Sequence, residues 1–320
     1  MNLKKQLLRQ PLSYNAESLI RKTALVFCGL LITTGAFAQE EEGKKKEKEE
    51  TEEDEWADEK QIHCFYDTRV INGHSTETLE KGTLDFRITH RFGNIGTPTA
   101  GRTLWGLDNS TDIRIAFEYA PTDHLLFGFG RSKGASPYSE FWDGFAKYSI
   151  LKQSKDMPVS LTWTSSIFAT SMSKSNDSTI LSSFPTVGHR FSYYNQLIIA
   201  KQFFDVLTVQ VAPGVLHRNY VYSFDQNTNV VLGGMLRYNF YKKMSLVAEY
   251  YHVFREASTG TSGKFYDPLA FGLEIKTYAH VFQLNFMNSE GLGEGQFIPY
   301  TGSKWKNGQF RFGFTISREF

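Results

Sequence analysis

The last stretch of the chain, GQFRFGFTISREF (308–320), decides the fold class. Phe310, Phe312, Phe314 and Ile316 fall on one parity, and the residues between them are polar or small. Alternation of this kind over about ten residues predicts a β-strand with one apolar and one polar face. Two settings fit the pattern: a half-buried strand of a soluble sandwich, and a strand with lipid outside and a polar lumen inside.

The N-terminus favours the second setting. Two basic residues open an otherwise apolar stretch, RKTALVFCGLLITTG (21–35), and AFAQ (36–39) offers an A-x-A cleavage site. This order is typical of a secretory signal peptide, here with a long n-region, so we expect residues 1–38 to be removed. Cys64 is then the one remaining cysteine, which excludes an intramolecular disulfide. No Cys/His spacing indicates a metal, and no motif indicates a cofactor.

The composition fits an exported membrane barrel. Aromatic residues make up 15% of the 320-residue chain, and the mean hydropathy is −0.36. After residue 38 no apolar run is long enough for a membrane-spanning helix. Polar lumen residues offset lipid-facing ones in any hydropathy average, so these values are typical of an outer-membrane barrel. The net charge of +1 gives no support for a nucleic-acid partner.

From residue 83 to the C-terminus the alternation predicts twelve strands, with fourteen as an alternative. The predicted strands are Leu84–Phe92, Asp112–Tyr119, His124–Arg131, Phe141–Leu151, Pro158–Ala169, Arg190–Ala200, Val206–His217, Asn229–Asn239, Met244–Phe254, Pro268–Lys276, His280–Asn288 and Gln309–Phe320. Long connections such as residues 93–111 alternate without exception with short ones such as residues 120–123. Outer-membrane barrels have long external loops and short periplasmic turns. We therefore expect an all-β, transmembrane, antiparallel up-and-down barrel of a Gram-negative outer membrane, with both termini periplasmic.

Two segments precede the barrel domain (83–320). Residues 39–60 are mostly charged and cannot bury a core, so we predict a disordered linker, with a docking tail as the alternative. Residues 61–82 contain one short β-like piece, residues 66–72. They are predicted to form a periplasmic cap, a plug or an extra strand.

The polar parity of the strands predicts the residues that line the lumen. They are Asp85, Arg87, Arg91, Arg114, Glu118, Asp143, Lys147, Arg237, Glu274, Gln283, Asn285 and Arg311. Twelve strands lie between the filled barrels of eight and the open barrels of sixteen, so a path for a small solute and a lattice of salt bridges both remain open. Strands 190–200 and 244–254 show no clear parity. The function predicted from this pattern is a passive channel or a small-solute transport element, and the solute is not indicated.

Two other functions remain as alternatives. His90, His217 and His252 are expected at the outer rim, where a lipid-modifying enzyme would need a histidine to activate a serine or water. No G-x-S-x-G motif is present and no catalytic residue is assigned, so we do not predict an enzyme. The second alternative is a structural or adhesive barrel that presents external loops such as residues 219–226.

The C-terminal strand also predicts partners. Its apolar parity, Phe310, Phe312, Phe314 and Ile316, would face outer-membrane lipid. With the terminal Phe320, this strand resembles the signal that the outer-membrane barrel assembly machinery recognises.

Five stretches resemble a known family. They are TRVINGHS (68–75), GTLDFRITHRFG (82–93), DGFAKYSILKQS (143–154), LHRN (216–219) and HVFQLNFMNS (280–289). Together they mark most of the mature chain as similar to the Bacteroidetes outer-membrane β-barrels of the domain-of-unknown-function family 5777. The resemblance implies a barrel in the outer membrane and implies no activity.

Overall fold

The computed structural model describes residues 61–320, except residues 97, 99, 110–111 and 256–264. The predicted signal peptide (1–38) and charged linker (39–60) lie outside the described residues. Within the described part of the chain, no helix has the length and apolar character that a membrane span requires.

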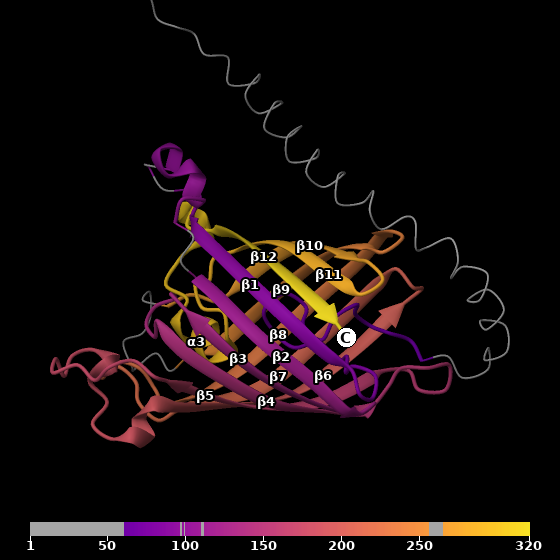
Figure 1. The fold of residues 1–320 in the computed structure, drawn as a ribbon, viewed down its shortest axis with the longest axis horizontal. Helices are drawn as coiled ribbons and strands as arrows, with labels where there is room; N and C mark the ends of the chain where they lie inside the picture. Colours follow the sequence, from indigo (N-terminus) through magenta and orange to yellow (C-terminus); the bar gives the residue numbers. More distant parts are fainter. Residues whose placement is uncertain (1–60, 97, 99, 110–111, 256–264) are drawn as a thin grey trace, which may run out of the picture. The chain divides into compact units, whose positions relative to one another are not determined.

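Twelve antiparallel strands close into a barrel, in which each strand pairs with its chain neighbours and β1 pairs with β12 (Figure 1). The strands are β1 (Leu84–Asn94), β2 (Asp112–Thr122), β3 (Leu125–Lys133), β4 (Glu140–Leu151), β5 (Ser160–Thr170), β6 (Phe191–Phe203), β7 (Leu207–Arg218), β8 (Thr228–Tyr241), β9 (Met244–Phe254), β10 (Leu269–Lys276), β11 (His280–Met287) and β12 (Arg311–Glu319). The predicted fold is confirmed, with twelve strands rather than fourteen.

The connections sort to two ends of the barrel. The long-loop end carries residues 95–111, 134–139, 171–190, 219–227, 255–268 and 288–310, and the short-turn end carries residues 123–124, 152–159, 204–206, 242–243 and 277–279. The predicted alternation of lengths has one exception, because the turn of residues 152–159 is longer than the loop of residues 134–139. In that turn Gln153 points inward, and its amide nitrogens donate to Ser160 Oγ (3.0 Å) and the Gln202 carbonyl (3.0 Å). These bonds fix the turn at the short-turn end of the barrel, and β5 begins only at Ser160.

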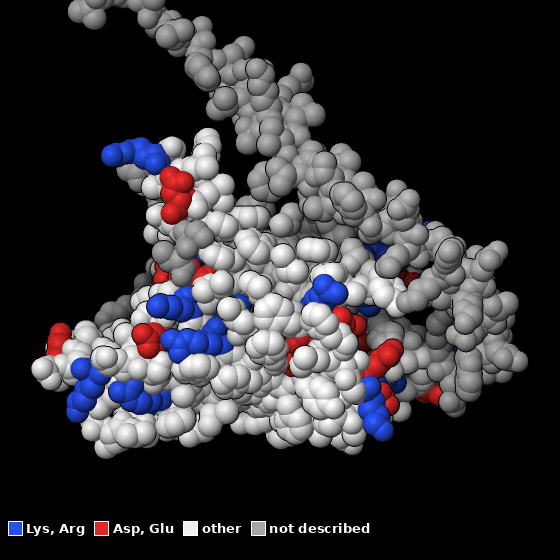
Figure 2. All heavy atoms as spheres, in the orientation of Figure 1, with Lys and Arg blue, Asp and Glu red and all other residues white. Residues whose placement is uncertain are grey.

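One parity of the strands forms an apolar outer wall. Ile115, Phe117 and Tyr119 of β2 are exposed, whereas Arg114 and Glu118 on the other parity are buried. Figure 2 shows that the visible wall is mostly uncharged, with Lys, Arg, Asp and Glu gathered toward its ends. A one-residue slip of any such strand would place charges in lipid, so the hydrophobic pattern specifies the register.

The two strands without a clear parity have apolar side chains on both faces. In β6 Tyr193 points outward while Tyr194 and Ile198 are fully buried inside, and in β9 Tyr250 is outside while Tyr251 is inside. The inner apolar face has a partner in the long loop between β11 and β12, which contains helix α3 (Glu294–Tyr300). All seven residues of α3 are buried, and the Phe297 ring lies 5.3 Å from the Tyr251 ring. Because both faces of these strands pack against apolar groups, their sequences do not alternate between apolar and polar residues.

The outward face of β12 gives a first test of the fold. Phe314 pairs with His90 of β1, and their rings stack 5.6 Å apart in the middle of the outer wall. A charge at the bilayer midplane costs about 2–4 kcal/mol, falling to about 0–1 near the interfaces. We expect Phe314→Arg to prevent stable insertion and Phe310→Arg, directly before β12, to be tolerated. Heat-modifiable migration on a gel measures this, and normal migration of Phe314→Arg would contradict the register.

Candidate functional site

Residues 61–82, which we call the plug, run through the barrel, with residues 64–77 almost all buried. Cys64, Phe65, Val70 and His74 are at most 2% exposed. The segment forms a single isolated bridge between Arg69 and His74, so it does not extend the sheet. The segment's burial and its lack of strand pairing favour the plug among the three alternatives, and its role as a plug stays a prediction.

Wall side chains satisfy the plug's backbone from several directions. Thr162 of β5 donates to the Thr76 carbonyl, Thr208 of β7 to the Cys64 carbonyl, Gln210 of β7 to the His74 carbonyl and Gln283 of β11 to the Val70 carbonyl, each at 2.8 Å. A buried segment without regular secondary structure must find partners for its peptide groups, and here the strands supply them.

A tight turn of the plug encloses one carboxylate. The Val70 amide donates to the Gly73 carbonyl at 2.9 Å, which closes the turn. Three successive amides, of Ile71 (3.3 Å), Asn72 (2.9 Å) and Gly73 (3.1 Å), then donate to the same Oε2 of Glu249 in β9. The Asn72 side chain donates to the other oxygen. Successive amides that converge in this way form an anion-binding nest, so Glu249 fixes the turn on the wall.

Lys147 of β4 performs the complementary task. Its fully buried ammonium donates to the carbonyls of Thr68 (2.8 Å), Ser75 (3.1 Å) and Glu77 (3.0 Å). One wall cation therefore holds three plug carbonyls on the two sides of the turn. Hydrogen bonds to charged groups are worth about 1.5–3 kcal/mol each, which makes Lys147 a major anchor.

A charged cluster joins the plug to β1 and β2. Both terminal nitrogens of Arg87 donate to the Asp67 carboxylate, one of them at 2.8 Å, and Asp85 lies 3.2 Å from the same guanidinium. Glu118 of β2 accepts from Thr68 Oγ1 at 2.6 Å. All these side chains are nearly fully buried, so each charge depends on its partners inside the barrel.

The other predicted lumen residues are also buried, with different partners. Arg237 donates to the Cys64 carbonyl (2.8 Å) and lies 3.6 Å from Glu274, whereas Arg114 pairs with Asp143 at 2.6 Å without a plug contact among these bonds. Arg91 donates to both the Asn72 side chain and the loop carbonyls of Glu290 and Gly291. Arg311 pairs with Glu290 (2.9 Å), Gln283 donates to Glu274 (3.0 Å), and Asn285 packs against Gly272. Their use as a solute path stays a prediction.

Helix α3 packs inside the barrel, toward the long-loop end. Glu294 accepts from Gln196 Nε2 at 2.7 Å and lies 3.5 Å from His74 Nε2 of the plug. Burial raises the pKa of Glu294 to about 7 and lowers the pKa of His74 well below its usual range. Near neutral pH His74 is therefore uncharged, and the contact between α3 and the plug is not an ion pair.

The predicted rim histidines do not converge. His90 in β1 stacks on Phe314, and His217 in β7 contacts Thr228 Oγ1 at 2.8 Å. His252 in β9 contacts Asp267 at 2.8 Å. Each histidine thus has a separate neighbourhood, and these contacts do not include a serine. Among residues 61–320, apart from residues 97, 99, 110–111 and 256–264, no group of three His, Cys, Asp or Glu residues is arranged to hold a metal ion.

The residues of the predicted C-terminal signal lie on or next to β12, where this strand pairs with β1. Phe310 stacks on Trp305 at 4.7 Å, and Phe312 and Phe314 both face the Phe92 ring of β1. Ile316 is opposite Ile88, and the terminal Phe320 is 64% exposed. Recognition of this strand by assembly machinery stays a prediction.

Solved structures with similar folds are porins, channels and other membrane barrels. The KdgM porin has a TM-score of 0.46 and 12% identity, over 74% of this chain and 99% of that chain. An outer membrane channel from Pseudomonas putida F1 has a TM-score of 0.47 and 13% identity, over 78% and 100%. LpxR from Salmonella typhimurium has a TM-score of 0.35 and 11% identity, over 74% and 99%.

The family comparison covers the plug and the barrel together. No curated protein matches the chain. The model of the membrane bound beta barrel domain (DUF5777) matches residues 65–320, which include most of the plug and all twelve strands. The chain therefore belongs to the DUF5777 family of membrane-bound β-barrels.

Proposed function

We propose that the protein is an outer-membrane channel for small polar solutes, which its own N-terminal segment keeps closed. The observation that carries this proposal is the chemistry between plug and wall. The anchors named above, Glu249, Lys147 and Arg87, are charged groups that bind the plug through hydrogen bonds. Water can replace such bonds when the plug leaves, whereas a permanent filler is served as well or better by apolar contacts.

The size of the barrel supports the same function. Eight strands give an interior that side chains alone fill, and sixteen leave an aqueous channel. In this twelve-stranded barrel the plug and α3 are buried inside the wall, which supports a closed state. The proposed closed state therefore depends on two segments that are held in the lumen by side-chain contacts and are not strands of the sheet.

The proposed location and orientation rest on the sequence and on the two ends of the barrel. The start of β1 and the end of β12 are paired at the short-turn end, as Asp85 lies opposite Glu319. Short turns face the periplasm in outer-membrane barrels, so we place both ends of the barrel, and the entry of the plug, on that side. The predicted signal peptide and the terminal Phe320 agree with this orientation.

The selectivity follows from the wall that the plug would uncover. The wall cations that lose plug partners when the segment leaves are Arg87, Arg91, Lys147 and Arg237. The wall carboxylates of Glu118 and Glu249 lose plug partners too, so the cations are in excess. Cationic side chains in a lumen favour anions. We propose a weak preference for small anionic solutes.

Deleting residues 61–82 tests the proposal. We expect the folded variant to conduct in discrete steps in a planar bilayer, while the chain that begins at residue 39 stays mostly closed. Heat-modifiable migration verifies that the inserted barrel is folded. In the same variant, Arg87→Glu should shift the selectivity toward cations. Silent bilayers containing folded deletion variant would contradict the proposal.

A further inference from the structure

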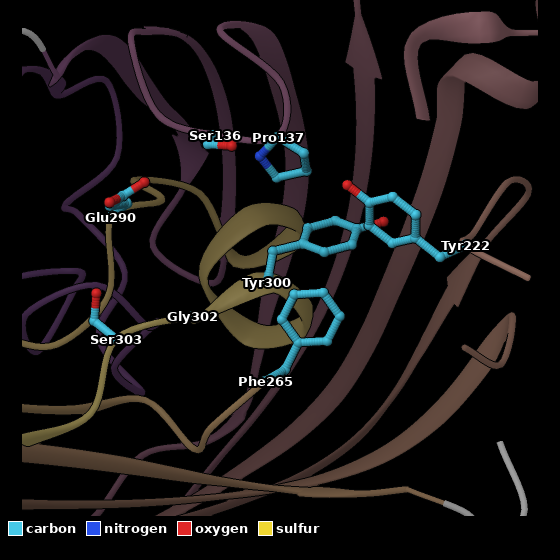
Figure 3. A pocket seen from close by; sticks show the side chains of 8 residues that line it. All are labelled: Ser136, Pro137, Tyr222, Phe265, Glu290, Tyr300, Gly302 and Ser303. Atoms are coloured by element: carbon cyan, nitrogen blue, oxygen red, sulfur yellow. The ribbon is translucent and has the colours of Figure 1, made fainter. Parts of the chain in front are cut away.

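A pocket opens at the long-loop end, beside the C-terminal end of α3. It has a volume of about 310 Å³, and its lining includes Ser136, Tyr222, Phe265, Glu290, Tyr300 and Ser303. Four loops thus contribute to it. Figure 3 shows the rings of Tyr222, Phe265 and Tyr300 on one side, and Glu290 and Ser303 on the other. None of these residues belongs to the set predicted from the lumen parity.

The aromatic side chains of the pocket are held in place by neighbouring rings and by a buried arginine. The Tyr222 ring stacks on Phe224 at 5.0 Å with an angle of 7°, and the Phe265 ring meets Tyr300 edge-on at 5.7 Å. The buried guanidinium of Arg218 lies 5.1 Å from the Tyr300 ring, and its charge is paired with Asp225 at 2.9 Å. The rings therefore present fixed flat faces to the pocket before any ligand arrives.

The polar side offers hydrogen-bond acceptors and a negative charge. Glu290 Oε1 accepts from Arg311 at 2.9 Å, which orients the carboxylate, and its side chain remains 40% exposed. The Ser136 and Ser303 hydroxyls add groups that both donate and accept. Three cations lie nearby. Arg311 pairs with Glu290 (2.9 Å), and Arg218 (2.9 Å) and Arg255 (3.7 Å) share the Asp225 carboxylate, so most of the positive charge around the pocket is compensated.

We propose that this pocket binds one or two rings of a neutral saccharide. A sugar ring has flat C–H faces that suit the aromatic side and a rim of hydroxyls that suits the carboxylate and serines. The volume lies at the small end of ligand pockets, about 300–1,000 Å³, which limits the site to a short segment. A negatively charged sugar would meet Glu290 and is disfavoured.

Occupancy of the pocket acts on the closed state. This step rests on the proposed function. Tyr300 lines the pocket at the end of α3, and Glu294 at the start of the same helix contacts Gln196 and His74 inside the barrel. A ligand shifts an equilibrium toward the conformation that it binds. Because the pocket exists with α3 folded inward, the saccharide keeps the barrel closed.

Calorimetric titration of the folded chain with maltose, cellobiose and lactose tests the site. We expect at least one of them to bind, and Tyr222→Ala to weaken its binding about tenfold because a ring face is lost. Tyr222→Phe keeps the face and should bind nearly as the unchanged chain does. Trp105→Ala is the matched control, because Trp105 is an exposed aromatic of another loop, residues 95–111, and does not line this pocket.

The outcomes separate the two parts of the proposal. The saccharide site is overturned if none of the three sugars gives a heat of binding, or if Tyr222→Ala binds the sugar as tightly as the unchanged chain does. It is also overturned if p-nitrophenol binds and no sugar does. In bilayers holding a conducting variant, the binding sugar should make openings rarer. Unchanged openings with a sugar that binds by calorimetry overturn the effect on closure and leave the site. Failure of the channel itself appears as absent conductance, while the calorimetric result stands.

Discussion

We expect Gly73→Ala to release the plug. A Cβ at residue 73 would overlap the Tyr251 hydroxyl oxygen and lie 2.8 Å from its ring carbon Cζ. Tyr251 cannot turn away easily, because it is fully buried and its ring packs edge-on against Phe297 of α3. Overpacking of this kind costs about 1–3 kcal/mol, and it falls on the turn that encloses Glu249. The open population should rise about tenfold to a hundredfold.

Cys64 reports this release directly. It is the one cysteine of a chain that begins at residue 39. It is fully buried while the plug is docked, and burial raises the pKa of its thiol to about 11. Maleimide labelling therefore measures the open population, and we expect its rate to rise with Gly73→Ala. Gly234→Ala in β8 is the matched control, since a Cβ there meets no heavy atom within 4 Å. Adding Tyr251→Phe removes the closest overlap and should slow labelling again. Equal rates for the alanine variants at positions 73 and 234 would refute the contact.

Lys147→Met is the second large perturbation. Methionine fills a similar length but donates nothing to the carbonyls of Thr68, Ser75 and Glu77. The Thr68 carbonyl keeps the Ser75 amide as a partner (3.0 Å), whereas the carbonyls of Ser75 and Glu77 lose theirs. Buried groups left without partners cost about 1–3 kcal/mol each, so we expect the docked plug to lose about 2 kcal/mol or more. That loss corresponds to roughly thirtyfold faster labelling of Cys64, or more.

The barrel itself should tolerate this change. Lys147 faces inward, and the ladder bonds of β4 with β3 and β5 do not involve its side chain. Lys155→Met, in the turn of residues 152–159, removes an exposed lysine and should leave both labelling and heat-modifiable migration unchanged. If Lys147→Met labels at the rate of Lys155→Met, the three carbonyl contacts do not hold the plug.

The sequence predicts the barrel well because alternation reports the two environments of each strand. β9 (Met244–Phe254) has the predicted bounds, and strands such as β1 and β2 show the expected polar inner face. Glu249 could not be assigned to the lumen, because β9 is apolar on both faces where Tyr251 meets α3. The signal of inward packing lies outside the strands, in apolar residues of the long loop such as Phe297 and Ile298.

The plug could not be identified from periodicity. Residues 61–82 form no regular element beyond one bridge, so neither a period of two nor of 3.6 marks them. Their conformation depends on bonds to distant strands, such as the 178 residues that separate Ile71 from Glu249. The stretch TRVINGHS (68–75), which carries the family resemblance, contains the turn around Glu249. Its chemistry becomes visible only when the barrel wall is in place.

Single-channel recording of Gly73→Ala/Ser160→Cys tests the central claim most directly. Cys64 Sγ lies 3.6 Å from Ser160 Oγ, so a thiol at residue 160 can reach the S–S distance of about 2.0 Å with a small shift. The matched control is Gly73→Ala/Ser166→Cys, whose new thiol lies on the same face of β5, about 20 Å along the strand.

We expect the oxidised protein, with residues 64 and 160 joined by a disulfide, to show no conductance. It should open in discrete steps when dithiothreitol reduces the disulfide. The control with the thiol at residue 166 should open in both conditions. Steps of the same size and frequency with the tether intact, in protein whose disulfide is verified by mass, would show that the plug does not close the lumen.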